Sequence, residues 1–568
     1  MVRRRMRGVV GGLLAAVVLC LVHGGAPHIR PRAVSGPALA AAEAAIGPPQ
    51  GAGVTGQERP ALPRVTLDTT VVSPSGRVIA VPAGGNLQAA LNAAQPGDVI
   101  DLPAGAVFVG NFTLPNKSGA EWITVRSSSS PRLPPPGSRV SPGDAVAMPK
   151  LVSPNSAPTL STAPRAHRYR LIGIEITTTS SVNFTLVLLE SPRQTSTEAI
   201  PTDIIVDRCY IHGTLEGEIR RGVALNGARL AVIDSYLSDF HQRGADTQAI
   251  AGWNGPGPFK IVNNYLEAAG ENVIFGGADP SILDLVPSDI EIRRNYLFKP
   301  LSWKIGEPAY AGRPWRVKNL FELKNARRVV VEGNIFEHNW AHAQNGFAIL
   351  FTVRNQDGRA PWSVVEDVTY VSNIVRDTGS GINILGRDDI HPSQQTRRIL
   401  IKNNLFEDVN GPRWGGEGRL FQLLNGTADV IIEQNMGLQT GEILAAGPGP
   451  HAGLIFRNNI VLHNMYGVGG DNTYGNPALT LSTYFPGAVF EGNILVGGNP
   501  ARYPARNSFP ASLDAIGFVN LHQGDCRLSA SSAYKHAGTE RKDPGVDLEA
   551  LRMAVGPTAR VGCGSAAP

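Results

Sequence analysis

This sequence of 568 residues has few of the motifs by which enzymes are usually recognised. It contains no nucleotide-binding glycine-rich loop, no metalloprotease motif and no serine nucleophile elbow. Its four cysteines include no pair at the spacing of a metal site. Charge is also scarce, since Asp, Glu, Lys and Arg make up 17% of the chain, whereas Gly (64) and Pro (43) are abundant. This composition favours a turn-rich β protein over a helical one.

The positive charge of the chain lies mainly at its N-terminus. A basic stretch, Arg3 to Arg7, precedes an apolar run, Gly8 to Val22, that is short for a membrane span. We therefore expect a signal peptide over residues 1–40, cut after Ala38-Leu39-Ala40; a cut near Ala26 and an uncleaved anchor are the alternatives. Residues 1–40 hold six arginines and no acid, which leaves 46 basic and 47 acidic residues in the remainder.

That balance argues against nucleic-acid binding. We expect a secreted or periplasmic bacterial protein, monomeric and not membrane-attached in its mature form. Cys209 follows a strand and is predicted to be a buried core residue. Cys526 and Cys563 flank the C-terminal segment, and in an oxidising compartment they could form a disulfide.

A short alternating strand, an asparagine and an apolar or aromatic residue recur along the chain. The asparagines are Asn264, Asn295, Asn334, Asn373, Asn404, Asn435, Asn459 and Asn493. A unit of this length cannot bury its own apolar face, so we predict a solenoid of stacked coils. We assign the asparagines a structural role, because Asn tolerates left-handed backbone and its amide can hydrogen-bond from coil to coil.

The chain divides around this repeat. Residues 41–75 are rich in Ala, Gly and Pro and are predicted to be a linker, residues 76–525 the solenoid, and residues 526–568 a C-terminal tail packing on or trailing it. Apolar residues at helical spacing between Asn86 and Gln95 predict a short helix that ends at Pro96-Gly97. Such a helix would cover the open end of the solenoid core.

These features resemble the right-handed parallel β-helix of the pectate lyase-like superfamily, over roughly residues 80–540. The resemblance implies an all-β solenoid of roughly 10–12 coils with an N-terminal capping helix. Segments 270–277 and 319–325 are similar to segments of secreted bacterial β-helix proteins that have no assigned activity. Function must therefore be argued from the site and not from the fold.

Two consecutive coils depart from the repeat. A second strand precedes each asparagine strand, and the position before its turn is small or apolar except at Lys324 and Arg354. Because neighbouring strands lie about 4.8 Å apart, we expect these two cations side by side on the surface. Adjacent positive charges lower the pKa of a lysine, which is one way to make it a base near neutral pH. The arginine would stay charged and could stabilise an anion.

The coil before Lys324 contains an extra segment, residues 299–318, rich in basic and aromatic side chains. Residues 299–328 hold eight basic residues and two acids, Glu307 and Glu322. We interpret the segment as a binding site for an acidic polysaccharide, since loops on a rigid scaffold often carry sites. Its predicted contact residues are Arg313, Trp315, Arg316, Lys318 and Glu322. The alternative is a solvated basic loop whose aromatics only cover the coil.

A Lys on one coil and an Arg on the next resembles the chondroitinase B and alginate lyase group. There the Lys abstracts the C5 proton of a uronic acid and the Arg assists at the leaving oxygen, so the resemblance implies Lys324 as base and Arg354 as its partner. That group has acidic calcium ligands shortly before the Lys, where this chain has Val317 and Asn319. If the protein uses calcium, Glu271 or Asp279 would be its ligand. If it does not, the basic residues would neutralise the charge of the uronate.

Three functions remain open at this point. The first is a polysaccharide lyase acting by β-elimination, and the second is a noncatalytic polysaccharide-binding or cell-surface β-helix protein. The third is a glycoside hydrolase, which needs two carboxylates of the kind that Asp388 and Asp389 could supply. The Gly-His-Gly and Arg-Ile-Lys elements of polygalacturonases are absent.

Overall fold

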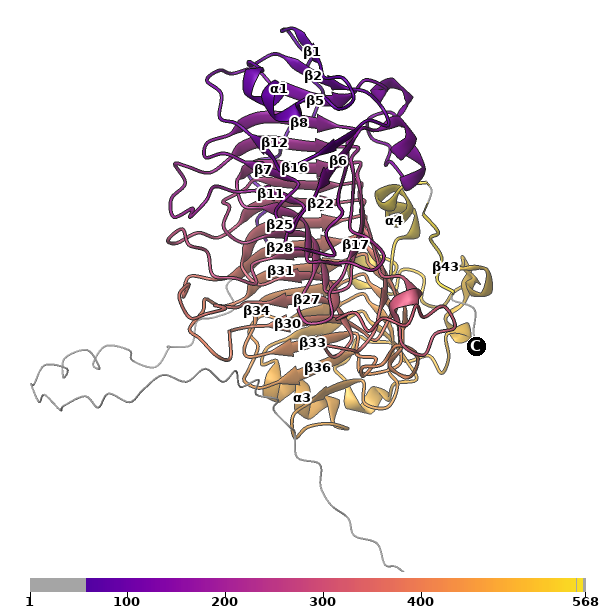
Figure 1. Ribbon diagram of the computed structural model, residues 1–568. Helices are drawn as coiled ribbons and strands as arrows, with labels where there is room; N and C mark the ends of the chain where they lie inside the picture. The colour runs from indigo at the N-terminus through magenta and orange to yellow at the C-terminus, as the bar shows by residue number, and fades with distance from the viewer. Residues whose placement is uncertain (1–57, 558, 565–568) are drawn as a thin grey trace, which may run out of the picture. The chain divides into compact units, whose positions relative to one another are not determined.

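The computed structural model describes residues 58–557 and 559–564. In these residues three long parallel sheets, here named A, B and C, stack coil on coil around one apolar core (Figure 1). The predicted all-β solenoid is therefore confirmed, and each coil except those at the two ends contributes one strand to each sheet. The predicted signal peptide and the first part of the predicted linker lie outside the described residues. No helix in the described part of the chain is long and apolar enough to cross a bilayer.

Sheet A has 14 strands within the described residues. They are β1 (Val78–Ala80), β2 (Val99–Leu102), β5 (Ile123–Ser127), β8 (His167–Ile172), β12 (Thr202–Asp207), β16 (Ala228–Ile233), β19 (Phe259–Val262), β22 (Ser288–Arg293), β25 (Ala326–Glu332), β28 (Val365–Val371), β31 (Arg397–Lys402), β34 (Ala428–Glu433), β37 (Ile455–Arg457) and β40 (Val489–Glu491).

Sheet B follows the asparagines and has 13 strands in the same part of the chain. They are β3 (Val107–Val109), β6 (Lys150–Ser153), β9 (Glu175–Thr178), β13 (Tyr210–His212), β17 (Tyr236–Phe240), β20 (Tyr265–Ala268), β23 (Tyr296–Phe298), β26 (Ile335–Asn339), β29 (Ile374–Thr378), β32 (Leu405–Val409), β35 (Met436–Gln439), β38 (Ile460–Leu462) and β41 (Ile494–Val496).

Sheet C completes each coil, with 12 strands among the residues described. They are β4 (Phe112–Leu114), β7 (Leu160–Thr162), β11 (Val187–Leu189), β15 (Arg221–Leu225), β18 (Gln248–Gly252), β21 (Glu271–Phe275), β24 (Asn319–Leu323), β27 (Phe347–Thr352), β30 (Ser380–Leu385), β33 (Phe421–Leu424), β36 (Leu444–Gly447) and β39 (Val468–Gly470). Two small pairs lie outside the three sheets: β10 (Val182–Asn183) with β14 (Glu218–Ile219), and β42 (Phe518–Asn520) with β43 (Asp525–Leu528).

The repeated asparagines form a continuous buried ladder between sheets A and B. Asn373 shows the pattern: its Oδ1 accepts from the backbone N–H of Asn334 at 2.9 Å and from the Asn334 amide at 3.0 Å. Its own amide donates to Asn404 Oδ1 at 3.1 Å and to the carbonyl oxygen of Val331 at 3.0 Å. The predicted structural role is thus confirmed.

The left-handed backbone lies one residue earlier than we expected. The residue before each ladder asparagine has positive φ, for example Asn263 (58°), Gly333 (66°) and Asn403 (56°), and the ladder asparagines themselves do not. The ladder position therefore selects asparagine for its amide hydrogen bonds and not for its backbone freedom.

Helices close both ends of the core (Figure 1). The predicted capping helix is α1 (Leu87–Ala93), whose N-cap Asn86 accepts from Ala89 N and whose Leu87 and Leu91 are buried. At the other end, α3 (Pro477–Tyr484) buries Leu481 in the same core. A single-turn helix, α2 (Gly411–Trp414), lies between β32 and β33.

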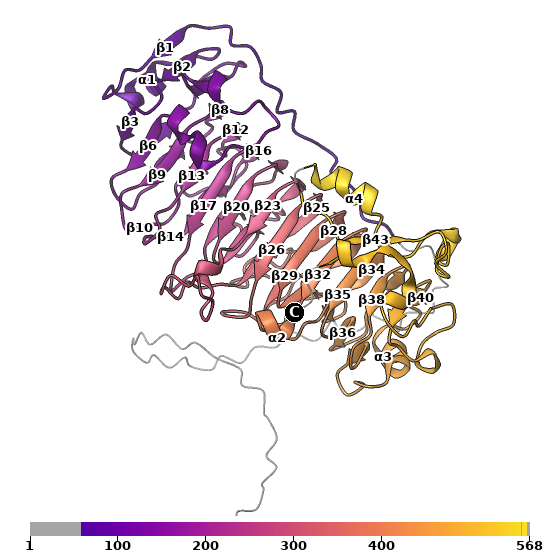
Figure 2. The ribbon, with the colours of Figure 1, turned by 90° about the vertical axis from the view of Figure 1, so that its right-hand side faces the viewer.

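The C-terminal tail packs across the outer face of sheet B (Figure 2). Helix α4 (Leu548–Val555) and strand β43 bury their apolar side chains against outward residues of that sheet such as Leu405 and Ile460. Cys526 and Cys563 form a disulfide within the tail, and Cys209 is a free, buried cysteine.

The end of the predicted linker is bound to the solenoid. Residues 58–75 run along sheet A, where the N–H groups of Ala61 and Arg64 donate to Asp367 and Asp289 at 3.0 and 2.8 Å (Figure 2). Leu67 is buried against Ile205 and neighbouring side chains of this sheet. The composition of this segment is typical of a linker, but its backbone N–H groups hold it on the solenoid by hydrogen bonds to aspartates of sheet A.

Candidate active site

Lys324 and Arg354 lie on consecutive coils at the end of sheet C. Lys324 directly follows β24, and Arg354 N donates to the carbonyl oxygen of Lys324 at 2.9 Å, so their backbones are neighbours. On the preceding coil the position is Gly276, where a Cβ would lie 2.8 Å from Lys324 Cβ. The absence of a side chain at Gly276 leaves the space that Lys324 occupies.

Each of these cations already has an anionic partner. Lys324 Nζ lies 3.6 Å from the buried carboxylate of Glu322, and 15% of the Lys324 side chain is exposed. Arg354 is 25% exposed and pairs with Asp388 at 2.7 Å and with Asp389. Burial works to lower the pKa of Arg354, but the two aspartates raise it overall.

Asp388 and Asp389 therefore hold Arg354 and do not form a free carboxylate pair. Asp388 also accepts from Asn355 N at 2.8 Å and from Ile390 N at 3.0 Å. Burial would raise the pKa of Asp388, but these donors and Arg354 lower it below its ordinary value. An ionised carboxylate is a poor general acid, which weighs against the hydrolase alternative.

A buried charge network lies beside Lys324 on the outer face of sheet C. Its centre is Lys318, whose ammonium contacts Glu271 at 2.5 Å and Asp246 at 2.7 Å. Arg316 pairs with the same Asp246 at 2.9 Å, and Gln248 donates to Glu271 at 2.8 Å. The network joins three neighbouring coils, because Gln248, Glu271 and Asn319 are in register.

Burial and the ion pairs act in opposite directions on the pKa values of Lys318, Glu271 and Asp246. Burial works to lower the pKa of Lys318, but the surrounding carboxylates, Glu271 first, raise it above its ordinary value. Burial raises the pKa of Glu271 despite the opposing charge of Lys318. The pKa of Asp246 is lowered, because Lys318 and Arg316 outweigh its burial. Lys318 is thus a fixed cation in this network.

A second buried lysine, Lys299, binds the backbone of the turn that precedes Glu271. It is fully buried, and its ammonium donates to the carbonyl oxygens of Ala268, Ala269 and Gly270 and to Asn272 Oδ1 at 2.6–3.0 Å. Burial lowers its pKa to about 7. The side chain ties together the backbone from which Glu271 enters the network.

The basic segment 299–318 differs from the open positive surface that we expected. Lys304 pairs with Glu307, and Arg313 pairs with Glu216, each at 2.8 Å. With Lys299, Arg316 and Lys318 also bound, every basic residue of the segment has a partner. Glu322 is likewise buried beneath the surface, where it accepts from Asn319 at 3.2 Å.

The aromatic residues of this segment do not form an open platform for sugars. Trp315 is 3% exposed and stacks on His241 with ring centroids 3.9 Å apart. Trp303 joins the same small apolar cluster with Trp340 and Trp414. The alternative, in which the aromatics cover the coil, describes the two tryptophans better, because packing against neighbouring rings buries their faces.

The chain's own groups occupy the candidate calcium ligands. Glu271 is bound by Lys318 and Gln248, and Asp279 Oδ2 accepts from the N–H groups of Asp357 and Arg359 at 3.0 and 2.9 Å. A lysine ammonium at Glu271 supplies the positive charge that a metal ion would otherwise bring. Glu271 therefore does not fit calcium, and at Asp279 only Oδ1, buried without a hydrogen-bond partner in the described part of the chain, is unoccupied.

Among the described residues, three metal-ligating side chains converge only at Glu337, His338 and Asp377. This group lies on sheet B, and Arg376 and Tyr296 already hydrogen-bond to Glu337. It is separate from the network around Lys318.

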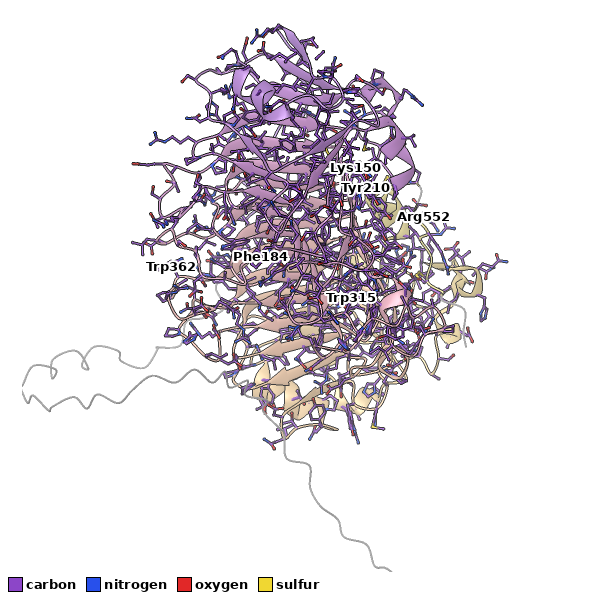
Figure 3. The ribbon with its side chains drawn as sticks, viewed as in Figure 1. Lys150, Phe184, Tyr210, Trp315, Trp362 and Arg552 are labelled. Carbon is purple, nitrogen blue, oxygen red and sulfur yellow. A yellow bond between two sulfur atoms is a disulfide. The ribbon has the colours of Figure 1, made fainter. Side chains whose placement is uncertain are left out.

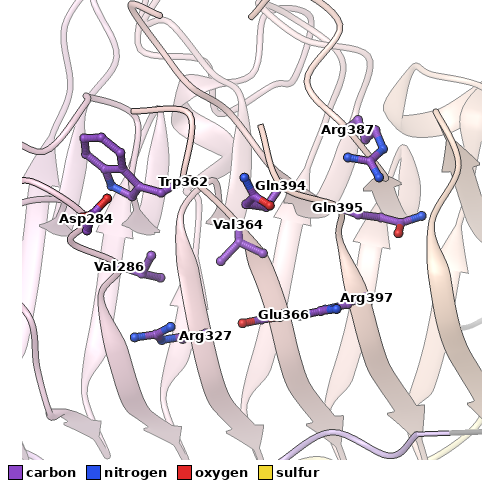
Figure 4. Close-up of a pocket in the computed structure, with 10 residues that line it drawn as sticks. All are labelled: Asp284, Val286, Arg327, Trp362, Val364, Glu366, Arg387, Gln394, Gln395 and Arg397. Atoms are coloured by element: carbon purple, nitrogen blue, oxygen red, sulfur yellow. Dashed lines mark hydrogen bonds and ion pairs between the residues drawn. The ribbon is translucent and has the colours of Figure 1, made fainter. Parts of the chain in front are cut away.

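A cavity of about 320 Å³ lies among the loops that connect sheets C and A (Figure 4). Trp362 and Arg387 lie at its rim, and Arg327, Glu366 and Arg397 form a row on its strands. Arg387 directly precedes Asp388, the partner of Arg354, so the cavity adjoins the predicted site through one loop. Trp362 and Trp315 are well separated in Figure 3.

Sequence reasoning did not find Asp246, Gln248, Trp362 or Arg387. Asp246 lies 72 residues before Lys318 in a turn without a motif. The signal that could have found Gln248 is the register of the coils, which aligns it with Glu271.

Solved structures share the arrangement of the coils. A PL6 family alginate lyase, AlyGC, superposes with a TM-score of 0.50 at 14% identity, over 85% of this chain and 58% of that one. The chain has the same parallel β-helix fold. A mannuronic acid specific family 6 lyase from human gut microbiota (TM-score 0.44, 13% identity) covers 77% of this chain and 93% of that one. Pectate lyase Pel9A gives 0.35 at 15% identity, over 82% and 92%.

No family model and no curated protein matches the sequence. At these identities the similarity establishes the fold and leaves the function to the site.

Proposed function

We propose that this protein cleaves a uronic-acid-containing polysaccharide by β-elimination, with Lys324 and Arg354 in the reaction. The observation that carries the proposal is the placement of these two cations on adjacent coils, both partly exposed, beside a network whose other charges are paired. The fold shared with AlyGC, an alginate lyase, is consistent with it.

In the proposed reaction Lys324, in its neutral form, takes the proton from C5 of the uronate. The electrons of the C5–H bond form the C4–C5 double bond, and the C4–O bond breaks with its electron pair on the leaving oxygen. That oxygen takes a proton from water, and Lys324 returns its own proton to the solvent, so the products are an unsaturated uronate and a new hydroxyl end. Arg354 stays cationic and stabilises the negative charge that develops on the substrate carboxylate.

We propose a secreted or periplasmic location for this activity. The Cys526–Cys563 disulfide supports it, because such bonds persist in oxidising compartments. An acidic polysaccharide is the proposed partner, and nucleic acid and calcium have no part in the proposal.

The noncatalytic alternative has one observation in its favour. The Glu322 carboxylate lies 3.6 Å from Lys324 Nζ and forms an ion pair with it, so the amine already has a partner within the protein. The cavity beside Trp362 and Arg387 would then bind a glycan without cleaving it.

A panel of uronic-acid polymers separates these functions when the full-length mature protein is incubated with each. Elimination produces an ultraviolet-absorbing unsaturated end together with a new reducing end, and hydrolysis produces the reducing end alone. A binder shifts in affinity electrophoresis but produces neither. Our proposal predicts absorbance with at least one polymer, and binding without any product would contradict it.

A further inference from the structure

The outer face of sheet B has a gap between its two covers (Figure 2). At the N-terminal end, Leu133 and Met148 of the loop 128–149 cover Tyr210 and Tyr236. At the other end the C-terminal tail covers the sheet from Ile374 onward. Between them lies a groove of about 690 Å³, which we call the arginine groove. Its polar lining includes Arg139, Arg294, Arg376, Arg560, Asn263 and Tyr296.

The arginine groove is lined by four guanidinium groups and by no carboxylate. Of the four, only Arg376 forms an ion pair with a carboxylate of the described residues, Glu337, at 2.5 Å. Arg139 donates to the carbonyl oxygens of Asn263 and Arg294, at 3.1 and 2.9 Å, and forms no ion pair. Carbonyl oxygens orient a guanidinium without neutralising its charge.

The guanidinium groups of the other two arginines, Arg294 and Arg560, form fewer hydrogen bonds within the protein. Arg294 is exposed, and its guanidinium has no hydrogen-bond or ion-pair partner among the described residues. Arg560 donates only to the carbonyl oxygen of Gly564, at 3.2 Å. None of Arg139, Arg294 and Arg560 forms an ion pair with a carboxylate of the described residues, although Asp234 lies near enough to Arg139, and Glu407 to Arg560, for their charges to interact. Elsewhere on sheets A and C most arginines are paired.

Burial adds a second reason to expect an anion. Desolvation is the main cause that lowers the pKa of Arg139 to about 10, and a bound anion would offset the cost of burying that charge. Tyr296 Oη donates to Glu337 at 2.9 Å, so Tyr296 and Arg376 of the groove bind the same carboxylate.

The tail shapes one wall of the groove. Gly333 allows this, because a Cβ there would lie 2.3 Å from the carbonyl oxygen of Ala554 in α4. Arg560 follows α4 and lies three residues before Cys563, which the disulfide ties to Cys526. The disulfide therefore fixes the segment that carries Arg560.

We propose that the arginine groove is a binding site for an oxyanion-bearing ligand, whose carboxylate, sulfate or phosphate groups bridge Arg139, Arg294 and Arg560. Guanidinium groups bind such oxyanions through paired, charge-assisted hydrogen bonds. The site lies on sheet B, apart from Lys324 on sheet C, and it does not depend on the proposed lyase activity.

Isothermal titration of the full-length mature protein tests the site with three probes: sodium phosphate, sodium sulfate and a saturated trimer of a uronic acid. The variants are Arg294→Gln and the double variant Arg139→Gln/Arg294→Gln. Arg132→Gln, an exposed arginine of the same loop with no partner among the described residues, is the matched control. Lys324→Ala separates this site from the proposed active site.

We expect at least one probe to bind, with affinity reduced about tenfold in Arg294→Gln and about a hundredfold in the double variant, since each lost charge-assisted bond is worth more than 1 kcal/mol. Arg132→Gln and Lys324→Ala should bind as the wild type does. The probe that binds most tightly identifies the oxyanion. Because the Arg294 guanidinium has no partner among the described residues, Arg294→Gln removes no side-chain contact that holds the fold.

Reduction of the disulfide should also weaken binding, because it releases the wall that carries Arg560. The proposal is overturned if no probe binds at millimolar concentration, or if the double variant binds within twofold of the control. Binding that is lost in Lys324→Ala would also overturn it, because the ligand would then occupy the sheet C site.

Discussion

Replacing Lys318 with methionine tests the buried charge network most sharply. The substitution keeps an unbranched side chain of similar shape, one atom shorter, and removes the ammonium that contacts Glu271 at 2.5 Å and Asp246 at 2.7 Å. Asp246 is partly exposed and keeps Arg316, but Glu271 is 1% exposed and loses its cation. Breaking a buried pair by removing one partner typically costs about 3–5 kcal/mol, so we expect a loss of that order at pH 7.

The pH dependence of this loss has a definite sign. Burial already raises the pKa of Glu271 in the folded protein, and removing Lys318 raises it further. A carboxyl whose folded pKa lies above its unfolded value gains stability as pH falls toward and below that pKa. The destabilisation by Lys318→Met should therefore be smaller at pH 5 than at pH 7.

Urea unfolding of each variant, followed by circular dichroism, measures this free energy. In Glu271→Gln/Lys318→Met the new amide can still accept from Gln248, and no unpaired carboxylate remains at position 271, so we expect most of the loss to be recovered. Arg316→Gln removes the exposed partner of Asp246 and should cost about 0–1 kcal/mol. A cost below about 1 kcal/mol for Lys318→Met, or no recovery in the double variant, would refute the reasoning.

Two further predictions concern the scaffold. Asn373→Ala removes four buried hydrogen bonds and should lower the free energy of unfolding by about 3 kcal/mol or more. The control, Asn507→Ala, lies at the partly exposed end of the ladder and should cost about 1 kcal/mol. Equal losses in urea unfolding would contradict a ladder stabilised by burial. Gly333→Ala places a side chain at a position of positive φ, with its Cβ 2.3 Å from the carbonyl oxygen of Ala554. We therefore expect α4 to detach and a protease to cut the tail faster. Unchanged proteolysis would argue against this close approach.

The repeat made the scaffold predictable. Alternating apolar residues and the spacing of Asn264 to Asn493 follow from packing within one coil, so strands, ladder and capping helix could be predicted from the sequence. The same register placed Lys324 and Arg354 on adjacent coils.

The electrostatic environment could not be predicted in this way. The partner of Lys318 is Asp246, from another coil, and the partner of Arg313 is Glu216, almost a hundred residues away. Counting charges along residues 299–328 therefore suggested a positive surface that pairing across coils neutralises. The burial of Trp315 could not be predicted for the same reason, because His241, which covers its ring, comes from a turn distant in the sequence.

The central claim is that Lys324 removes a proton from a uronate. The most direct measurement is the rate of ultraviolet absorbance increase with the preferred polymer, for Lys324→Ala against Lys542→Ala, a surface lysine paired with Glu540. Losing a general base should lower kcat by about 10²–10⁴-fold in Lys324→Ala, with the control unchanged. Full activity of Lys324→Ala would contradict the account.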